Sequence, residues 1–400
     1  MDSKVFDTSR KVQIIDAEAT NSVEAKLLGM DRQGIEWKMI MPNTGRAGYR
    51  LHRDSSFTPY RSNILAPLTR HARRAKLPND AIYSFSKYYR GLVPAVNHFQ
   101  LRYNIAAVSK YDIIHLEMDG FYKFSSLDHD IRHYTFSESF KPVSLSYLDG
   151  YAALAGMHGE MAIYDLKTNK VRHFEKITNE NHILNFISIY KEEGKLHILT
   201  GANDCFIRIY RMEYLTKPFY EKTLENPVNN CSISPTDTNL VAVCSDQNEV
   251  EIIDVRADKT VIKLYGHEDY SFTSDWHPNG LYLATGNQDL TCRVWDIRKY
   301  KKELQILQSE IACASNVKFL AGGQYLAFAE GIDFVSIYDF ENNCDAYQRI
   351  DGFGEISGLT TDSEDNEKLF FGMNLVDYEG VFEYTLKKRS TIKMLEESFL

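Results

Sequence analysis

The residues of this sequence that could do acid–base or metal chemistry are its histidines and carboxylates, and few are spaced for it. His267 and Asp289 could form a pair, since an imidazole held by a carboxylate can act as a general base. His129 and His133 could present two metal ligands on one face of a helix, but no third ligand is evident. GxSxG, HExxH, P-loop and GxGxxG patterns are absent. We therefore expect no enzyme activity, no metal and no cofactor.

The elements that would position these residues form a repeat. Between residues 266 and 296, two apolar runs rich in β-branched and aromatic residues flank the turn His277-Pro278-Asn279-Gly280, where Gly280 can take a positive φ. Similar strand-like runs end in seven anchor segments, 42 to 49 residues apart, each expected at the end of the third strand of its repeat. The anchors are IIHLE (His115), AIYDL (Tyr164), RIYRM (Tyr210), EIIDV (Ile253), RVWDI (Trp295), SIYDF (Tyr338) and FEYTL (Tyr384).

The stretch GHEDYSFTSDWHPNGLYLATGNQDLTCRVWD closely resembles the WD40 repeat, which opens on Gly-His and closes on Trp-Asp. The resemblance implies a hydrogen-bond relay from Trp295 to Thr285, then to His267 and Asp289. On this interpretation His267 and Asp289 are structural and not catalytic. The fold class we predict is all-β, a seven-bladed WD40 β-propeller with an irregular N-terminal extension.

The expected organisation has three parts. Residues 1–90 form the extension, residues 91–390 the propeller and residues 391–400 a C-terminal tail. Within the extension we expect a short helix in residues 16–30, a basic arm and a strand near residues 81–85 that closes the ring. Closure matters because a single blade buries its faces on its neighbours and cannot stand alone.

Composition limits the classes of protein. The 400 residues carry a net charge of −9, and no apolar run is long enough to cross a membrane. The start of the chain lacks a secretory signal, and the six cysteines show no CxxC spacing. We expect reduced core thiols in a cytoplasmic or nuclear protein that does not bind membranes.

Residues 41–90 are basic, with ten Arg or Lys against two Asp, and contain the cluster Arg70, Arg73, Arg74 and Lys76. In the simplest interpretation these side chains pair with the acidic propeller. Alternatives are a site for a protein partner, contact with nucleic acid or chromatin, and a nuclear-import patch.

Loops on the wider rim of a propeller usually bind partners. In this sequence those loops are rich in carboxylates and amides, which suits a basic peptide or an α-amino group. The residues we expect there are His158, Asn181, His182, Asp204, Asn229, Asn230, Asp246, Asp269, Tyr270, Gln288, Asp333 and Glu355.

Several further segments resemble a family of WD-repeat proteins found in plants and fungi. They include GMDRQGIEW (29–37), HFQLR (98–102), PVNNCSISP (227–235) and AEGIDFVSIYD (329–339). A more distant fungal relative is a substrate receptor of a ubiquitin ligase. The resemblance implies a non-enzymatic scaffold or adaptor for a protein or peptide, with a ubiquitin-ligase complex as one partner to consider. The alternative is a nucleic-acid or chromatin-associated protein that acts through the basic arm.

Overall fold

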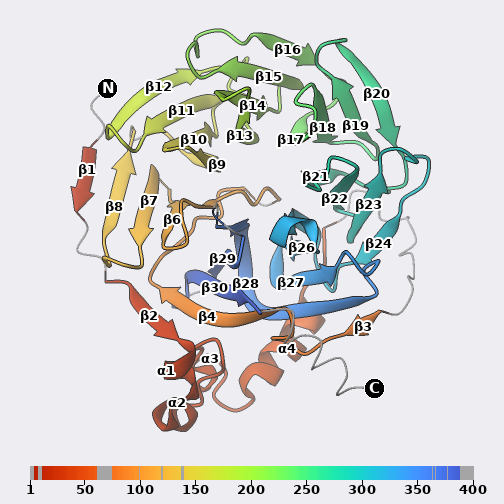
Figure 1. Cartoon of the computed structure of the whole chain (residues 1–400). Coiled ribbons are helices and arrows are strands. Elements are labelled where there is room, and N and C mark those ends of the chain that lie inside the picture. Colours follow the sequence, from red (N-terminus) through yellow and green to blue (C-terminus); the bar gives the residue numbers. More distant parts are fainter. Residues whose placement is uncertain are drawn as a thin grey trace.

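The computed structural model describes residues 4–7, 11–60, 74–98, 100–118, 120–136, 139–362, 364, 366–375 and 377–387. Within these residues the strands form six sheets arranged in a ring, with antiparallel pairing throughout except for the short parallel pair of β3 and β28 (Figure 1). Four of the sheets have four strands each, one has five and one has nine.

The strands of the four-stranded sheets follow one another along the chain, and so do those of the five-stranded sheet except for β1. The five-stranded sheet holds β5 (Ile105–Ala107), β6 (Asp112–Leu116), β7 (Gly120–Ser125), β8 (Ile131–Thr135) and β1 (Lys4–Asp7). The next two sheets hold β9 (Pro142–Leu148), β10 (Tyr151–Gly156), β11 (Glu160–Asp165) and β12 (Lys170–Lys176), then β13 (Phe186–Glu192), β14 (Lys195–Gly201), β15 (Phe206–Arg211) and β16 (Tyr220–Thr223). The other two four-stranded sheets hold β17 (Val228–Ile233), β18 (Leu240–Ser245), β19 (Val250–Asp254) and β20 (Lys259–Leu264), then β21 (Ser271–Trp276), β22 (Tyr282–Asn287), β23 (Thr291–Asp296) and β24 (Gln305–Gln308).

The nine-stranded sheet joins the two ends of the chain. It holds β25 (Ala314–Leu320), β26 (Tyr325–Glu330), β27 (Ile332–Asp339), β28 (Ala346–Thr361), β29 (Lys368–Asn374), β30 (Gly380–Leu386), β4 (Tyr83–Arg90), β2 (Gln13–Asp16) and β3 (Ala75–Lys76). The first part of β28 pairs with β27 and the second part with β29, so the sheet can be divided within β28 into two four-stranded blades. The two remaining strands add to their edges, β2 on β4 and β3 on the first part of β28. The strand predicted to close the ring lies at β4, which pairs antiparallel with β30.

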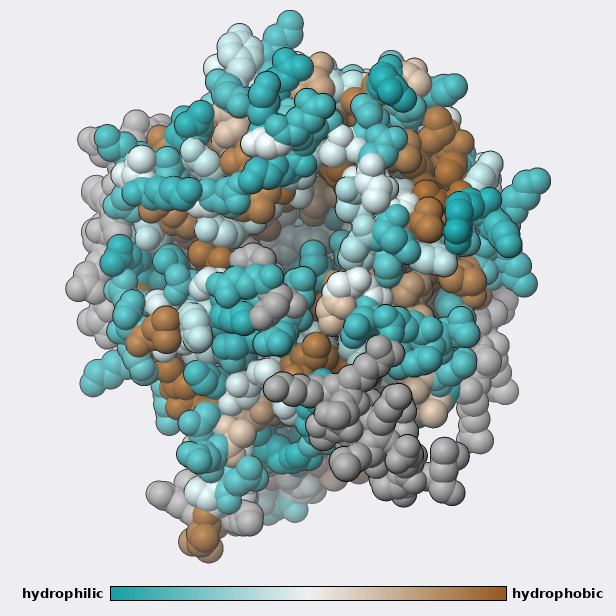
Figure 2. Space-filling model, in the orientation of Figure 1, coloured by the Kyte–Doolittle hydropathy of each residue, from teal (hydrophilic) through white to brown (hydrophobic). Residues whose placement is uncertain are grey.

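Seven strands line the central channel, whose volume is about 440 Å³. They are β5, β9, β13, β17, β21, β25 and the second part of β28. Figure 2 shows the hollow at the centre of the ring. The predicted number of seven blades depends on dividing the large sheet within β28, and it stays a prediction.

The middle strands of the sheets are buried over most of their length. Every residue of β26 is buried, whereas the outer strand β12 has only exposed and half-buried positions. The middle strands do not alternate between buried and exposed residues, because each sheet is packed on both faces by its neighbours. All six cysteines are free thiols, four of them buried and two half-buried.

One anchor was assigned to the wrong strand. His115 lies in β6, the second strand of its sheet, and not at the end of the third. The innermost strand β5 of this sheet has only three residues, and residues 100–102 lie outside the strands. His133 lies in β8, where it stacks on Tyr122, and His129 lies in a loop, so the two do not share a helical face.

The extension contains four helices among the described residues: α1 (Ala17–Asn21), α2 (Val23–Leu28), α3 (Trp37–Ile40) and α4 (Gly45–Ser56). The predicted short helix is thus split at Ser22, whose hydroxyl accepts the N–H of Ala25. Figure 1 shows the four helices gathered on the side of the ring where β4 lies. No helix in the described ranges is long and apolar enough to cross a membrane.

Candidate partner-binding rim

The rim of the propeller consists here of the loops that enter each innermost strand and the loops between second and third strands. On the nine-stranded sheet this rim carries Asp333, whose side chain is completely buried. Helix α4 covers it. Arg50 and Arg53 approach its carboxylate at 3.0 and 3.1 Å, and the Tyr49 hydroxyl donates to it at 2.9 Å. Burial and the charge of Asp333 raise the pKa of Tyr49 to about 12, so the phenol stays a donor.

A second carboxylate, Asp351, holds the same helix. Arg50 donates to one of its oxygens, and Arg46 lies 3.4 Å from the other. Arg46 also pairs at 3.2 Å with Asp31, which accepts the indole N–H of Trp37 at 2.6 Å. The Trp37 ring packs on Tyr49 and, edge to face, on Phe353. The extension is therefore docked on the propeller by ion pairs around an aromatic core.

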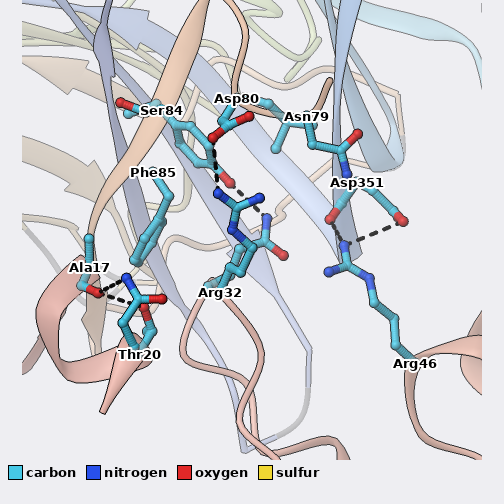
Figure 3. A pocket seen from close by; sticks show the side chains of 13 residues that line it. Ala17, Thr20, Arg32, Arg46, Asn79, Asp80, Ser84, Phe85 and Asp351 are labelled. Atoms are coloured by element: carbon cyan, nitrogen blue, oxygen red, sulfur yellow. Dashed lines mark hydrogen bonds and ion pairs between the residues drawn. The ribbon is translucent and has the colours of Figure 1, made fainter. Parts of the chain in front are cut away.

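A pocket of about 320 Å³ lies between the docked extension and the nine-stranded sheet (Figure 3). Arg32 donates to Asp80 at 2.9 Å across it, and Arg46 points to Asp351 on its other side. Gln33 donates to the Tyr384 hydroxyl at 2.7 Å. The charged groups that line the pocket pair with each other or with Asp31 and Lys387, which indicates a role in holding the extension in place.

The mouth of the channel is crossed by the segment 100–104. Its main chain is held from several sheets: Leu145 donates to the Tyr103 carbonyl, Asn104 donates to the Ser357 carbonyl, and Asn316 donates to the Arg102 carbonyl. A side chain at Gly358 would lie about 3.1 Å from the Arg102 carbonyl, so glycine there allows the close approach. The channel mouth is thus partly closed by the chain itself.

Five of the twelve residues predicted to bind a partner are not available at the surface. Asn229, Asn230, Asp269, Gln288 and Asp333 are all buried. Each is used inside the protein. For example, Asn230 accepts two hydrogen bonds from Ser274, and Gln288 donates to Asp269 at 3.0 Å. The prediction was wrong for these residues because amides and carboxylates in tight loops satisfy nearby backbone and side-chain groups before they reach solvent.

The other seven lie at or near the surface. Asp204 is engaged by Arg208 at 2.7 Å, and Asp246 accepts from Asn229 at 2.8 Å. Tyr270 is half-buried, while His158, Asn181, His182 and Glu355 are exposed. His158 and His182 belong to neighbouring loops, since Leu184 donates to the Gly156 carbonyl between them. The rim is therefore less acidic than its sequence indicates, and its exposed arc is polar.

The relay implied by the WD40 resemblance lies in the sheet that begins with β21. The Trp295 indole donates to the Thr285 hydroxyl at 2.9 Å, His267 Nε2 lies 2.8 Å from that hydroxyl, and His267 Nδ1 lies 2.9 Å from Asp289. Burial alone would raise the pKa of Asp289, but His267 and Thr291 lower it to about 2. All four side chains are buried, which leaves no access for a substrate.

The basic cluster is only partly described. Arg70 and Arg73 lie outside the described residues; Arg74 donates to Gln305 at 2.8 Å, and Lys76 is exposed in β3. The basic residues that hold the extension are instead Arg46, Arg50 and Arg53, which we did not single out. Their spacing of three to four residues on one helix, beside Tyr49, was the available signal.

Comparisons with known proteins agree with this architecture. The family model "WD domain, G-beta repeat" matches residues 258–296. A THO complex subunit 6 homolog of Danio rerio is 27% identical over 41% of this chain and 53% of its own length. The GATOR2 complex protein WDR24 of Homo sapiens is 23% identical over 42% of this chain and 21% of its own length. The chain thus spans about half or less of these relatives.

Among solved structures, a chain of the mitotic checkpoint complex matches 82% of this protein with a TM-score of 0.65 and 12% identity, which shows a shared fold. No group of three or more potential metal ligands occurs among the described residues. The repeat, the relay and these likenesses together identify the chain as a WD40-repeat β-propeller protein.

Proposed function

We propose that this protein is a non-enzymatic interaction scaffold that binds a protein or peptide on the part of the rim left open by its own extension. The observation that carries the proposal is the position of α4. It occupies Asp333 and Asp351, while His158, Asn181 and His182 form an exposed arc on neighbouring loops. The names of several relatives, which are subunits of complexes, agree with a scaffold role.

The predicted preference for a basic peptide loses much of its support. Asp269 and Asp333 are buried, and Asp204 is paired with Arg208. Polar side chains and an exposed histidine pair remain, and these suit a partner that contributes hydrogen bonds.

The test is a pull-down with proximity labelling from cells. The triple variant His158→Arg, Asn181→Arg and His182→Arg changes three exposed side chains, so the fold should be kept. We expect it to lose partners that the wild type captures. Lys259→Glu, an exposed change on the outer strand β20, is the matched control and should keep them. An identical partner set for all three proteins would exclude the rim.

The same experiment examines the ubiquitin-ligase hypothesis. A substrate receptor should capture ligase subunits, and its targets should live longer when the protein is removed. The nucleic-acid alternative predicts salt-sensitive binding that is lost when Arg70, Arg73, Arg74 and Lys76 are replaced. The described part of the extension gives it little support, because Arg46, Arg50 and Arg53 already pair with carboxylates.

A further inference from the structure

A small pocket of about 170 Å³ lies beside the segment that crosses the channel mouth. The chain that leaves α4 forms one wall, and loops of the propeller form the others. Its lining comprises Phe57, Thr58, Pro59, Tyr60, Gln100, Arg102, Gln288, Ala312, Cys313, Gly331, Ile332 and Glu355.

Arg102 is the unusual member of this lining. Only 3% of its surface is exposed. Its Nη1 donates to the His98 carbonyl, its Nε is buried without a hydrogen-bond partner, and no carboxylate among the described residues lies within ion-pair distance. Burial lowers the pKa of its guanidinium, and the nearby Glu355 opposes that effect.

A buried guanidinium without an anion within ion-pair distance is costly, because its charge is removed from water without compensation. Contrast Arg50 and Arg53, which are more exposed and yet share the carboxylate of Asp333. Glu355 is exposed and does not reach Arg102. The missing partner of Arg102 is therefore an anion that could enter through the pocket.

The backbone around Arg102 is rigid. Its carbonyl accepts from Asn316 at 2.8 Å, and the neighbouring Tyr103 hydroxyl donates to the Phe272 carbonyl at 3.3 Å. Tyr103 also packs edge to face on Phe186. A guanidinium fixed in this way loses little freedom when it binds a ligand.

We propose that this pocket binds a carboxylate group, with Arg102 as its ion-pair partner. The inference rests on the proposed function, because the ligand group would come from a bound protein or from a small molecule at the same rim. The flat fork of a guanidinium matches the two oxygens of a carboxylate. The volume suits one acidic side chain or chain end, and the Glu355 carboxylate at the edge disfavours the higher charge of a phosphate.

The test uses the full chain and short blocked peptides. The probes are Ac-Ala-Glu-Ala-amide for a side-chain carboxylate, Ac-Ala-Ala-Ala acid for a chain end, sodium acetate for a free anion and Ac-Ala-Gln-Ala-amide as the neutral control. Cys313 lines the pocket, and burial raises the pKa of its thiol to about 11, so alkylation is run at alkaline pH, where a bound probe should slow it. Peptide mass spectrometry measures the rate. Cys205 is also a half-buried free thiol, but it lies outside the pocket lining and is the internal reference.

We expect at least one carboxylate probe to protect Cys313 and leave Cys205 unchanged, while the Gln peptide protects neither. Arg102→Met should weaken binding by about ten-fold or more, because it removes a charge-assisted fork. Arg102→Lys keeps the charge without the fork and should give an intermediate loss. Glu355→Gln removes a like charge at the edge and should strengthen binding by roughly two-fold.

Three outcomes would overturn the proposal: no carboxylate probe protects Cys313, the neutral peptide protects it equally, or both Arg102 variants bind as well as the wild type. If Arg102→Met unfolds the protein, Arg102→Lys decides the result. If the rim variant loses its partners but no carboxylate protects Cys313, the scaffold proposal stands and this inference fails. If a carboxylate probe protects Cys313 but the rim variant keeps all its partners, the pocket binds a carboxylate and the scaffold proposal fails.

Discussion

Two buried carboxylates, Asp289 and Asp333, are held by the same kind of interaction in different regions of the propeller. Asp289 is held within one sheet by His267, 22 positions earlier in the chain. Asp333 is held by Tyr49, 284 positions away, together with Arg50 and Arg53 of the same helix. The first carboxylate fixes a single blade, and the second fixes the extension on the rim.

The difference shows that short-range sequence patterns predict contacts within one repeat but not contacts between distant segments. A contact inside one repeat has a fixed spacing, because the strands and turns between its residues have a fixed length. A contact between the extension and a distant loop has no such spacing. The closed ring alone brings β4, and with it the extension, next to the last strands.

The largest effect should come from the blade relay. Trp295→Ala removes a fully buried indole and should lower the free energy of unfolding by roughly 3–5 kcal/mol. Trp295→Phe keeps most of the packing but loses the donor to Thr285, so we expect about 1–3 kcal/mol. Urea unfolding followed by circular dichroism measures both. If both variants lose the same free energy of unfolding, the lost hydrogen bond and not the lost packing explains the effect of Trp295→Ala.

The docked extension gives the next effect. Replacing both Arg50 and Arg53 by Ala leaves the buried Asp333 charge without a cation, which should cost about 3 kcal/mol. Adding Asp333→Asn to that double variant removes the charge and should restore part of the stability. If Asp333→Asn brings no recovery, the ion pairs are not what holds α4, and the comparison with Asp289 fails.

Lowering the pH should reveal how much the relay carboxylate, Asp289, contributes to stability. The pKa of Asp289 is lowered from 3.8 to about 2 in the folded protein, so its contribution is present above pH 4 and is lost as the pH falls toward 2. The wild type should lose about 2 kcal/mol over this window from this group. Asp289→Asn should be less stable at pH 7 and should lose less stability between pH 4 and 2. Parallel curves for the two proteins would contradict the assignment.

The smallest effect should come from an exposed pair at the edge of the extension. Arg32 is 73% exposed and pairs with Asp80 at 2.9 Å. Solvent screens such a pair, so Arg32→Ala should change the free energy of unfolding by less than about 0.5 kcal/mol. Thermal unfolding at low and high salt is the measurement. If Arg32→Ala lowers the free energy of unfolding as much as the Arg50 and Arg53 double variant does, burial does not determine how much these ion pairs stabilise the protein.

Part of the fold was predictable because propeller repeats carry local signals. Tyr164, Tyr210, Ile253 and Trp295 lie in the third strands of their sheets, as expected, and Tyr338 and Tyr384 lie in the third strands of the two parts into which β28 divides the nine-stranded sheet. His115 was misplaced because the first inner strand has only three residues, too few to show a pattern. For the rim, composition alone could not separate Asp269, buried against Gln288, from the exposed Glu355.

The sequence by itself determined the all-β repeat, because residue types at short, regular spacings predict strands and turns, and its resemblance to the WD40 repeat implied the relay residues of one blade. It left open which strand closes the ring, because β4 pairs with β30 about 300 positions later. The tertiary structure alone decided which carboxylates face solvent, that α4 covers Asp333, and that Arg102 lies buried at the channel mouth without an anion. Those features depend on contacts between segments far apart in the chain, and their charges are satisfied or left unpaired only once the ring has closed.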